Sequence, residues 1–168
     1  IDKFKKIVRF NNYKLTSSLN KYLGTKTHIH CFGSTIVQRP IFHESVKFKH
    51  IIKLLIDNGR PQCSCRDKSK LLSKYKDIKI EGCIPFIFLE KMRKKYKYKT
   101  THFSSGLSVI LYYLFYKNEQ FVYITNFDNC LEYKKTHYFD NEKSRTHNWQ
   151  QEKKIIDILV LQKKIKIL

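Results

Sequence analysis

The sequence predicts an α+β fold, built as a small single domain with basic extensions at its ends. The chain has 168 residues, 42% of them hydrophobic, which is enough for one compact core. Apolar residues recur at helical spacing in much of the first two-thirds, whereas residues 107–139 are rich in aromatic and β-branched side chains. We therefore expect helices in the N-terminal two-thirds and an antiparallel β-meander near residues 107–139.

Charge and hydropathy divide the predicted domain into three parts. Residues 1–24 form a basic N-terminal segment, and residues 25–152 form the α+β body. Residues 153–168 form a basic and apolar C-terminal segment, which predicts either a terminal helix or an added strand. Because the sequence begins with Ile1 instead of Met, we expect a processed form whose leader has been removed.

Two strands and a short helix are expected at the start of the chain. Residues 6–10 and 28–37 are rich in β-branched side chains, which predicts strands. Between them, residues 16–23 predict a short helix. Gly24 can end that helix, because glycine readily adopts the left-handed conformation found at helix C-termini.

Two helices are expected in the region that follows. The clearer one covers residues 43–58, where Ser45 can cap the helix and Gly59 ends it. Apolar residues on one face of residues 67–76 predict the second helix.

A short strand, a turn and a third helix come next. Residues 78–80 predict the strand, and the Glu-Gly pair at residues 81–82 predicts the turn. Residues 85–96 predict the helix, since Pro85 is tolerated in a first helical turn.

The predicted meander has three strands. Residues 107–116 and 121–127 read as strands joined by a polar turn at 117–120, and a third strand covers residues 131–139. A helix over residues 104–116 competes with the first strand, because periodicity does not distinguish a short apolar strand from a buried helix.

The net charge of +20 is the strongest functional indication in the sequence. There are 34 Lys and Arg residues against 14 Asp and Glu residues. The excess of lysine and the absence of alanine indicate an AT-rich genome, but AT-rich codons also permit Asp and Glu, which are scarce. Such a charge on a small body favours a polyanionic partner, above all nucleic acid.

A basic cluster with interleaved tyrosines is the best candidate for that contact. From Lys91 to Lys99, six basic residues stand in nine positions, with two tyrosines among them. Lysines neutralise phosphates, and tyrosine rings stack on unpaired bases. With the basic N-terminus included, the predicted RNA-binding residues are Lys3, Lys5, Lys6, Arg9, Lys91, Arg93, Lys94, Lys95, Tyr96, Lys97, Tyr98 and Lys99.

The five cysteines indicate a reducing compartment, because their odd number fits a disulfide framework poorly. Cys31, Cys63, Cys65 and Cys83 are candidate zinc ligands, since zinc binds four sulfur or nitrogen donors. Their spacing matches no standard zinc knuckle, and buried thiols that act as small hydrophobes are the favoured interpretation. We therefore expect no cofactor, with zinc as the alternative.

No short catalytic or membrane-spanning motif is present. The sequence has no glycine-rich phosphate loop and no metalloprotease or serine hydrolase motif. The Asp, His and Glu residues near 128–142 could hold a metal, but polar turn residues are the simpler explanation. The longest apolar run, residues 107–116, is too short to span a bilayer. We expect a protein that is not an enzyme and has no integral membrane segment.

Basic charge, a small body and the lack of a catalytic motif together predict a structural component of a ribosome. We expect a mitochondrial ribosome, with a plastid ribosome as the alternative, and rRNA and neighbouring ribosomal proteins as partners. Two other classes stay open. One is a nucleic-acid processing enzyme or factor that uses the Cys/His residues or the acids near 128–142. The other is a peripheral membrane or respiratory-complex subunit whose basic surface meets anionic lipid.

Overall fold

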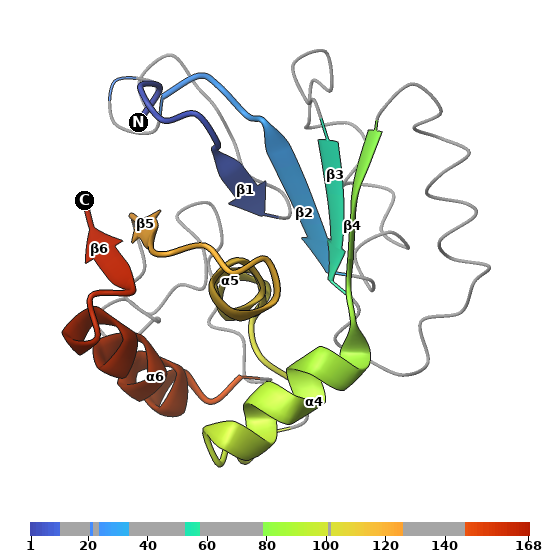
Figure 1. The fold of residues 1–168 in the computed structure, drawn as a ribbon, viewed down its shortest axis with the longest axis vertical. Coiled ribbons are helices and arrows are strands. Elements are labelled where there is room, and N and C mark those ends of the chain that lie inside the picture. The colour runs from blue at the N-terminus through green and yellow to red at the C-terminus, as the bar shows by residue number, and fades with distance from the viewer. Residues whose placement is uncertain (11–20, 22–23, 34–52, 58–78, 101, 126–146) are drawn as a thin grey trace, which may run out of the picture. The chain divides into compact units, whose positions relative to one another are not determined.

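The chain divides into two compact units, Ile1–Phe86 and Ile87–Leu168, in a computed structural model (Figure 1). The structure describes residues 1–10, 21, 24–33, 53–57, 79–100, 102–125 and 147–168. The predicted helices at 16–23 and 67–76 and the predicted strand at 131–139 lie outside this part of the chain, apart from Lys21, which is helical.

The described residues of the first unit form a four-stranded parallel sheet. Its strands are adjacent in chain order, and each pairs in parallel with the next (Figure 1). Parallel neighbours need long crossover connections, and the chain between consecutive strands is long enough for them. The strands are β1 (Val8–Phe10), β2 (Ile29–Gly33), β3 (Lys53–Asp57) and β4 (Lys79–Ile84).

Strand β2 has buried side chains on both faces. Ile29, His30 and Cys31 follow one another along the strand, so their side chains alternate between the two faces, and all three are buried. Burial on both faces is typical of strands inside parallel sheets. The predicted strands at 6–10 and 28–37 are confirmed where they overlap β1 and β2.

Two predictions for this unit are wrong. The last part of the helix expected at 43–58 forms strand β3, which has a hydrogen-bonded neighbour on each side. A strand in that position reads as a continuous apolar run, so periodicity does not distinguish it from a helix. The turn expected at 81–82 lies within β4. There, Leu54 is opposite Ile80 and Leu55 is opposite Gly82, so the residue between forms a bulge.

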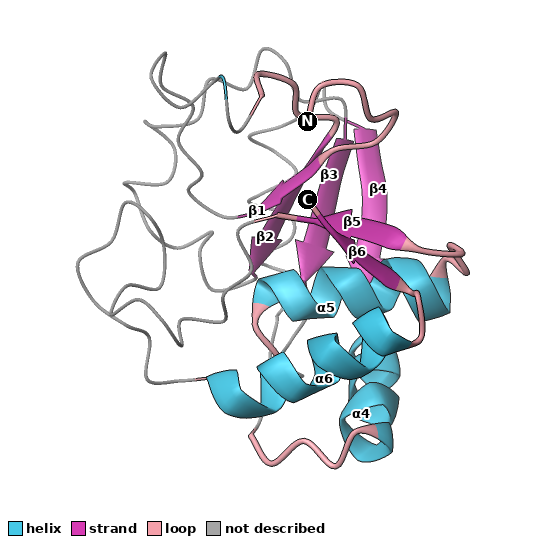
Figure 2. Ribbon diagram, turned by 90° about the vertical axis from the view of Figure 1, so that its left-hand side faces the viewer, coloured by secondary structure: helices cyan, strands magenta, loops and turns pink. Residues whose placement is uncertain are grey.

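The described residues of the second unit form three helices, one π-helical turn and a two-stranded sheet (Figure 2). Helix α4 (Phe86–Lys95) begins at the unit boundary, directly after Pro85, and confirms the helix predicted at 85–96. The other elements are α5 (Ser105–Leu111), the π-helical η3 (Tyr112–Tyr116), β5 (Val122–Ile124), α6 (Trp149–Leu161) and β6 (Ile165–Ile167).

The predicted antiparallel meander is wrong. Residues 107–116 form α5 and η3, so the competing helix over 104–116 is the one present. All eight residues from Leu107 to Leu114 are buried, and a helix that is apolar all round shows no helical periodicity. Ser104 caps this helix by accepting a hydrogen bond from the backbone of Leu107 at 3.3 Å.

The α+β class built on that meander is wrong as well, because every strand pair in the described residues is parallel. Strand β5 lies within the strand predicted at 121–127, but it pairs in parallel with β6. The C-terminal segment, for which helix and strand were alternatives, contains both, with α6 followed by β6. None of the described helices has the length and apolar character needed to cross a membrane.

Candidate functional site

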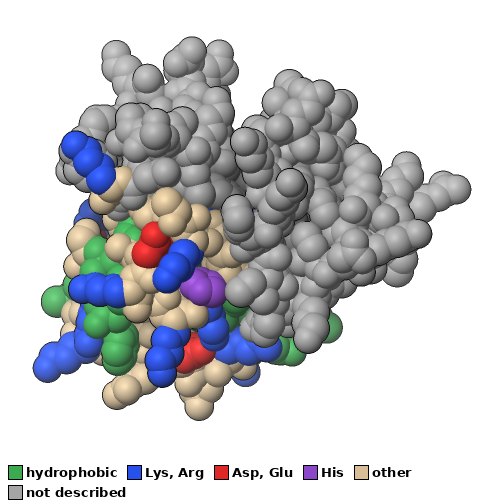
Figure 3. Space-filling view, turned by 90° about the horizontal axis from the view of Figure 1, so that it is seen from above, with side chains coloured by type: hydrophobic (Ala, Val, Ile, Leu, Met, Phe, Trp, Pro, Cys, Tyr) green, Lys and Arg blue, Asp and Glu red, His purple; other side chains and the backbone are tan. Residues whose placement is uncertain are grey.

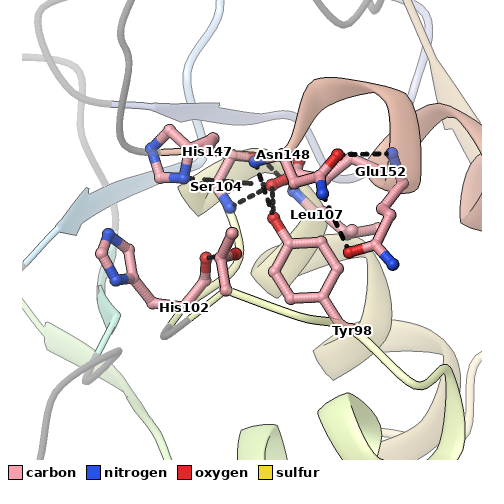
Figure 4. Close-up of polar contacts among 9 residues, drawn as sticks. Tyr98, His102, Ser104, Leu107, His147, Asn148 and Glu152 are labelled. Carbon is pink, nitrogen blue, oxygen red and sulfur yellow. Dashed lines mark hydrogen bonds and ion pairs between the residues drawn. The ribbon is translucent and has the colours of Figure 1, made fainter.

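A buried carboxylate, Glu152, is the centre of a polar network in the second unit (Figure 4). Only 1% of its side chain is exposed. Its Oε1 atom accepts hydrogen bonds from the Tyr98 hydroxyl at 2.9 Å and from the backbone N–H of Ser104 at 2.8 Å. The Ser104 hydroxyl donates to Oε2 at 2.5 Å. A buried charge is tolerated when its oxygens are paired in this way.

Three elements bring these groups together. Tyr98 follows the end of α4, where Lys97 adopts a φ of 49° and turns the chain. Ser104 is the N-cap of α5. Glu152 lies in the first turn of α6, where the partial positive charge of the helix N-terminus favours a carboxylate.

The start of α6 is fixed by a second set of hydrogen bonds. The Asn148 side chain accepts from the backbone N–H of Gln151 at 3.1 Å, which caps the helix. The Gln151 side-chain oxygen accepts from Asn148 Nδ2 at 3.1 Å and from the backbone N–H of Lys99 at 3.0 Å. The backbone N–H of Asn148 donates to the Tyr98 hydroxyl at 3.3 Å. The segment after α4 and the start of α6 therefore hold each other in place.

His147 stands immediately before this cap. Its Nδ1 atom lies 4.0 Å from Glu152 Oε1, which is within ion-pair range but longer than a hydrogen bond. Its ring centroid lies 5.2 Å from that of His102 and 5.0 Å from that of Trp149, with the rings steeply inclined in both pairs. The His147 side chain is 17% exposed, so it is accessible from outside whereas Glu152 is not.

Burial shifts the pKa values of both Glu152 and Tyr98. It raises the pKa of Glu152 above the usual value of 4.5, while hydrogen bonds from Ser104 and Tyr98 oppose that rise. Burial also raises the pKa of Tyr98, and the nearby charge of Glu152 adds to the effect, so this phenol stays protonated and keeps donating.

An imidazole beside a buried carboxylate can act as a general base. One ring nitrogen faces the carboxylate, which stabilises the imidazolium that forms when the other nitrogen takes a proton. Groups of this kind commonly loosen without substrate and tighten when it binds, so a separation of 4.0 Å is compatible with that role. The network can therefore deprotonate a hydroxyl presented to His147.

Comparisons with known proteins bear on the fold. No protein-family model matches the sequence, and no curated protein matches it. Among solved structures, the chain is similar to one described as the crystal structure of a mammalian sialyltransferase, with a TM-score of 0.69 and 17% identity. The alignment covers 100% of this chain and 61% of that one. The chain therefore shares the fold of the part of that protein that the alignment covers. It spans less than two-thirds of that protein's length.

The expectation that the chain is not an enzyme is contradicted, because the solved structure that shares its fold is described as an enzyme. That expectation relied on the lack of a short motif. The site residues Tyr98, Ser104 and Glu152 are brought together only by folding, so no short motif contains them.

The predicted basic cluster, which covers the second half of α4 and the residues after it, is divided between surface and interior. The side chains of Lys91, Lys94, Lys95, Lys97 and Lys99 are exposed. In contrast, Arg93 is half-buried and pairs with Glu90, and the Tyr98 ring is buried against Phe103 at a centroid distance of 4.5 Å. Tyr96 is half-buried beside Lys95, whose Nζ lies 5.4 Å from the Tyr96 ring centroid. The lysines face solvent, whereas Tyr98 belongs to the Glu152 network.

The predicted N-terminal basic residues belong to the first unit. Lys3, Lys5 and Lys6 are exposed. Arg9 has a structural role, because its guanidinium donates to the Thr27 hydroxyl at 3.0 Å and to the backbone oxygen of Gly24 at 3.3 Å. Figure 3 shows Lys and Arg side chains lying among apolar and polar ones on one face of the described residues.

The candidate metal ligands are only partly described. Cys31 is buried in β2 and Cys83 lies in β4, while Cys63, Cys65 and the acids near 128–142 are outside the described residues. Among the residues that the structure describes, no three His, Cys, Asp or Glu side chains are grouped as metal ligands.

Sequence reasoning missed His147, Ser104 and Glu152 as site residues. A signal for part of the site was present, because Asn148 and Gln151 have the spacing of a helix capping box. This capping box indicates that the C-terminal helix begins at residue 149, whereas the predicted C-terminal segment began at residue 153. The earlier start places Glu152 in the first turn of the helix. Nothing in the sequence alone indicates that this carboxylate meets Ser104.

Proposed function

We propose that the chain is the core of a glycosyltransferase that moves a sialyl-type sugar from an activated donor to an acceptor hydroxyl, with His147 as the general base. The observation that carries the proposal is the His147 imidazole held beside the buried Glu152 carboxylate. The likeness in fold to a mammalian sialyltransferase supports the choice of reaction class.

The reaction needs one base. The acceptor oxygen attacks the anomeric carbon of the donor and forms the new C–O bond. The bond from that carbon to the phosphate of the leaving group breaks, and its electron pair departs on the phosphate oxygen. The acceptor proton passes to Nε2 of His147, while Nδ1 stays on the side of Glu152.

Glu152 serves the reaction through His147. Its negative charge stabilises the imidazolium at the moment of proton transfer, and the Tyr98 and Ser104 hydrogen bonds keep the carboxylate in place. A carboxylate fixed before the reaction does not have to reorient as charge develops.

The positive charge of the chain also supports this proposal. A sialyl sugar carries a carboxylate and an activated donor carries phosphate, so the substrate is anionic. A net charge of +20 raises the local concentration of such a substrate and its rate of association.

The test is transfer of a labelled, nucleotide-activated sialic acid to a panel of glycan acceptors, followed as labelled product. We expect His147→Ala to reduce kcat by at least about 100-fold and Glu152→Gln by about tenfold, in keeping with the loss of a general base and of its partner. Gln150→Ala is the control, because this residue is exposed on the same turn of α6. Full activity of His147→Ala would remove the proposed mechanism.

A second candidate function, binding of rRNA in a mitochondrial or plastid ribosome, is favoured by the exposed lysines in the second half of α4 and just after it. Gradient sedimentation of the tagged protein from native lysate tests it. Migration with a ribosomal subunit that is lost after RNase treatment would support this candidate, and migration as a small species would count against it.

A further inference from the structure

We infer that His102 is a positioning residue that holds the His147 ring in the orientation needed for proton transfer. The inference rests on the proposed function of His147. It adds a residue whose ring packs on the His147 ring, whereas Tyr98 and Ser104 bind the Glu152 carboxylate.

The backbone around His102 is held on both sides. The Thr100 hydroxyl donates to the His102 backbone oxygen at 3.4 Å. On the other side, Phe103 is only 3% exposed and packs on Tyr98, and the next residue, Ser104, is bound to Glu152. His102 therefore projects from a segment that has little freedom to shift.

The His102 ring meets the His147 ring almost at a right angle. The centroids lie 5.2 Å apart and the planes are inclined by 82°, which is the favoured edge-to-face arrangement of aromatic rings. Trp149 contacts the same His147 ring at 5.0 Å and 61°. Figure 4 shows His102 and His147 side by side, with His147 next to Glu152.

The contacts with His102 and Trp149 restrict the rotation of the His147 ring, which the Glu152 carboxylate does not do at its observed distance. At 4.0 Å, Glu152 attracts the His147 ring without a hydrogen bond to fix its rotation. A ring flip would exchange a nitrogen and a carbon on the carboxylate side and would turn Nε2 away from the acceptor. Packing against two inclined rings opposes that rotation, and even a 1 Å misplacement of a catalytic group can cost about 100-fold in rate.

The experiment compares three variants, His102→Ala, His102→Phe and Gln150→Ala, with the wild-type chain. His102→Ala removes the ring, His102→Phe keeps a ring without nitrogens, and Gln150→Ala is the surface control. We expect His102→Ala to lower kcat by about tenfold with KM for the acceptor within about twofold. We expect His102→Phe to restore kcat to within about threefold of wild type.

A second readout does not depend on activity. In protein with ¹⁵N-labelled histidine, the His147 nitrogens should give one tautomer pattern in the wild type and in His102→Phe, and an averaged pattern in His102→Ala. Wild-type kcat in His102→Ala, or equal damage in both His102 variants, would overturn the positioning role. If His147→Ala keeps full activity, the proposed function fails, while the nitrogen spectra still decide whether His102 orients the His147 ring.

Discussion

At the scale of single residues, the carboxylates of Glu152 and Asp2 lie in contrasting environments. Glu152 is buried, and burial raises its pKa. Asp2 accepts hydrogen bonds from the backbone N–H groups of Thr25 and Lys26, and these bonds lower its pKa to about 2. The two groups should therefore give opposite dependences of stability on pH.

Glu152 should make the protein less stable as pH rises. A raised pKa means that the folded state holds its proton more tightly than the unfolded state does. The stabilisation is complete below about 4.5 and is lost as pH rises through the folded pKa. We expect wild type to lose stability relative to Glu152→Gln over this range, measured by urea unfolding at several pH values. A difference that does not change with pH would contradict this prediction.

Asp2 should act in the opposite direction. Its stabilisation is present above about 3.8 and is lost as pH falls through about 2. Asp2→Asn should cost about 1 kcal/mol at neutral pH, a value reduced for partial exposure to solvent. Urea unfolding measures the cost, which should disappear at the acidic end. A constant cost would show that the charge is not responsible.

Because Gly24 has no side chain, the Asp2 carboxylate can occupy the space beside its Cα atom. Its φ is +69°, and an added Cβ atom would lie 2.3 Å from Asp2 Oδ1. We expect Gly24→Ala to lower the free energy of unfolding by about 2–3 kcal/mol, from backbone strain and from displacement of Asp2. Adding Asp2→Ala in the same chain removes the clash, so the two substitutions should be less than additive. Strict additivity would contradict the steric explanation.

At the scale of elements, the start of α6 both stabilises that helix and positions residues of the site. Asn148 caps this helix between His147 and the turn that carries Glu152. Asn148→Ala should cost about 1 kcal/mol and should also lower the activity attributed to His147. Thermal unfolding and the transfer assay measure the two effects, and Asn148→Asp, which retains a capping oxygen, is the control. Loss of stability in both variants would show that the cap is not the cause.

Elements with local signals were predicted from the sequence, whereas those decided by their neighbours were not. Helix α4 follows a proline and has an amphipathic pattern, so it was predicted. Strand β3 and helix α5 are short apolar segments, and the partners that decide between strand and helix are distant in sequence. The site was not predicted for the same reason, because the contact of Ser104 with Glu152 joins residues that are 48 positions apart in the sequence.

At the scale of the whole molecule, the charge of +20 predicts binding to polyanions that weakens with salt. Each of the five exposed lysines in the second half of α4 and just after it that contacts a phosphate should contribute about one unit to the slope of log affinity against log salt. Replacing all five by glutamine should flatten that slope for a model RNA, measured by fluorescence anisotropy. The set is Lys91, Lys94, Lys95, Lys97 and Lys99. An unchanged slope would place the polyanion contact elsewhere.

The Glu152 hydrogen bonds join residues that are far apart in the sequence, and this separation affects the folding kinetics. Its partners Tyr98 and Ser104 lie 54 and 48 positions away, so these bonds form only after a large loop has closed. Contacts made after the folding transition state affect the unfolding rate more than the folding rate. Loss of the Glu152 carboxylate would then shorten the lifetime of the native second unit while leaving its rate of formation nearly unchanged.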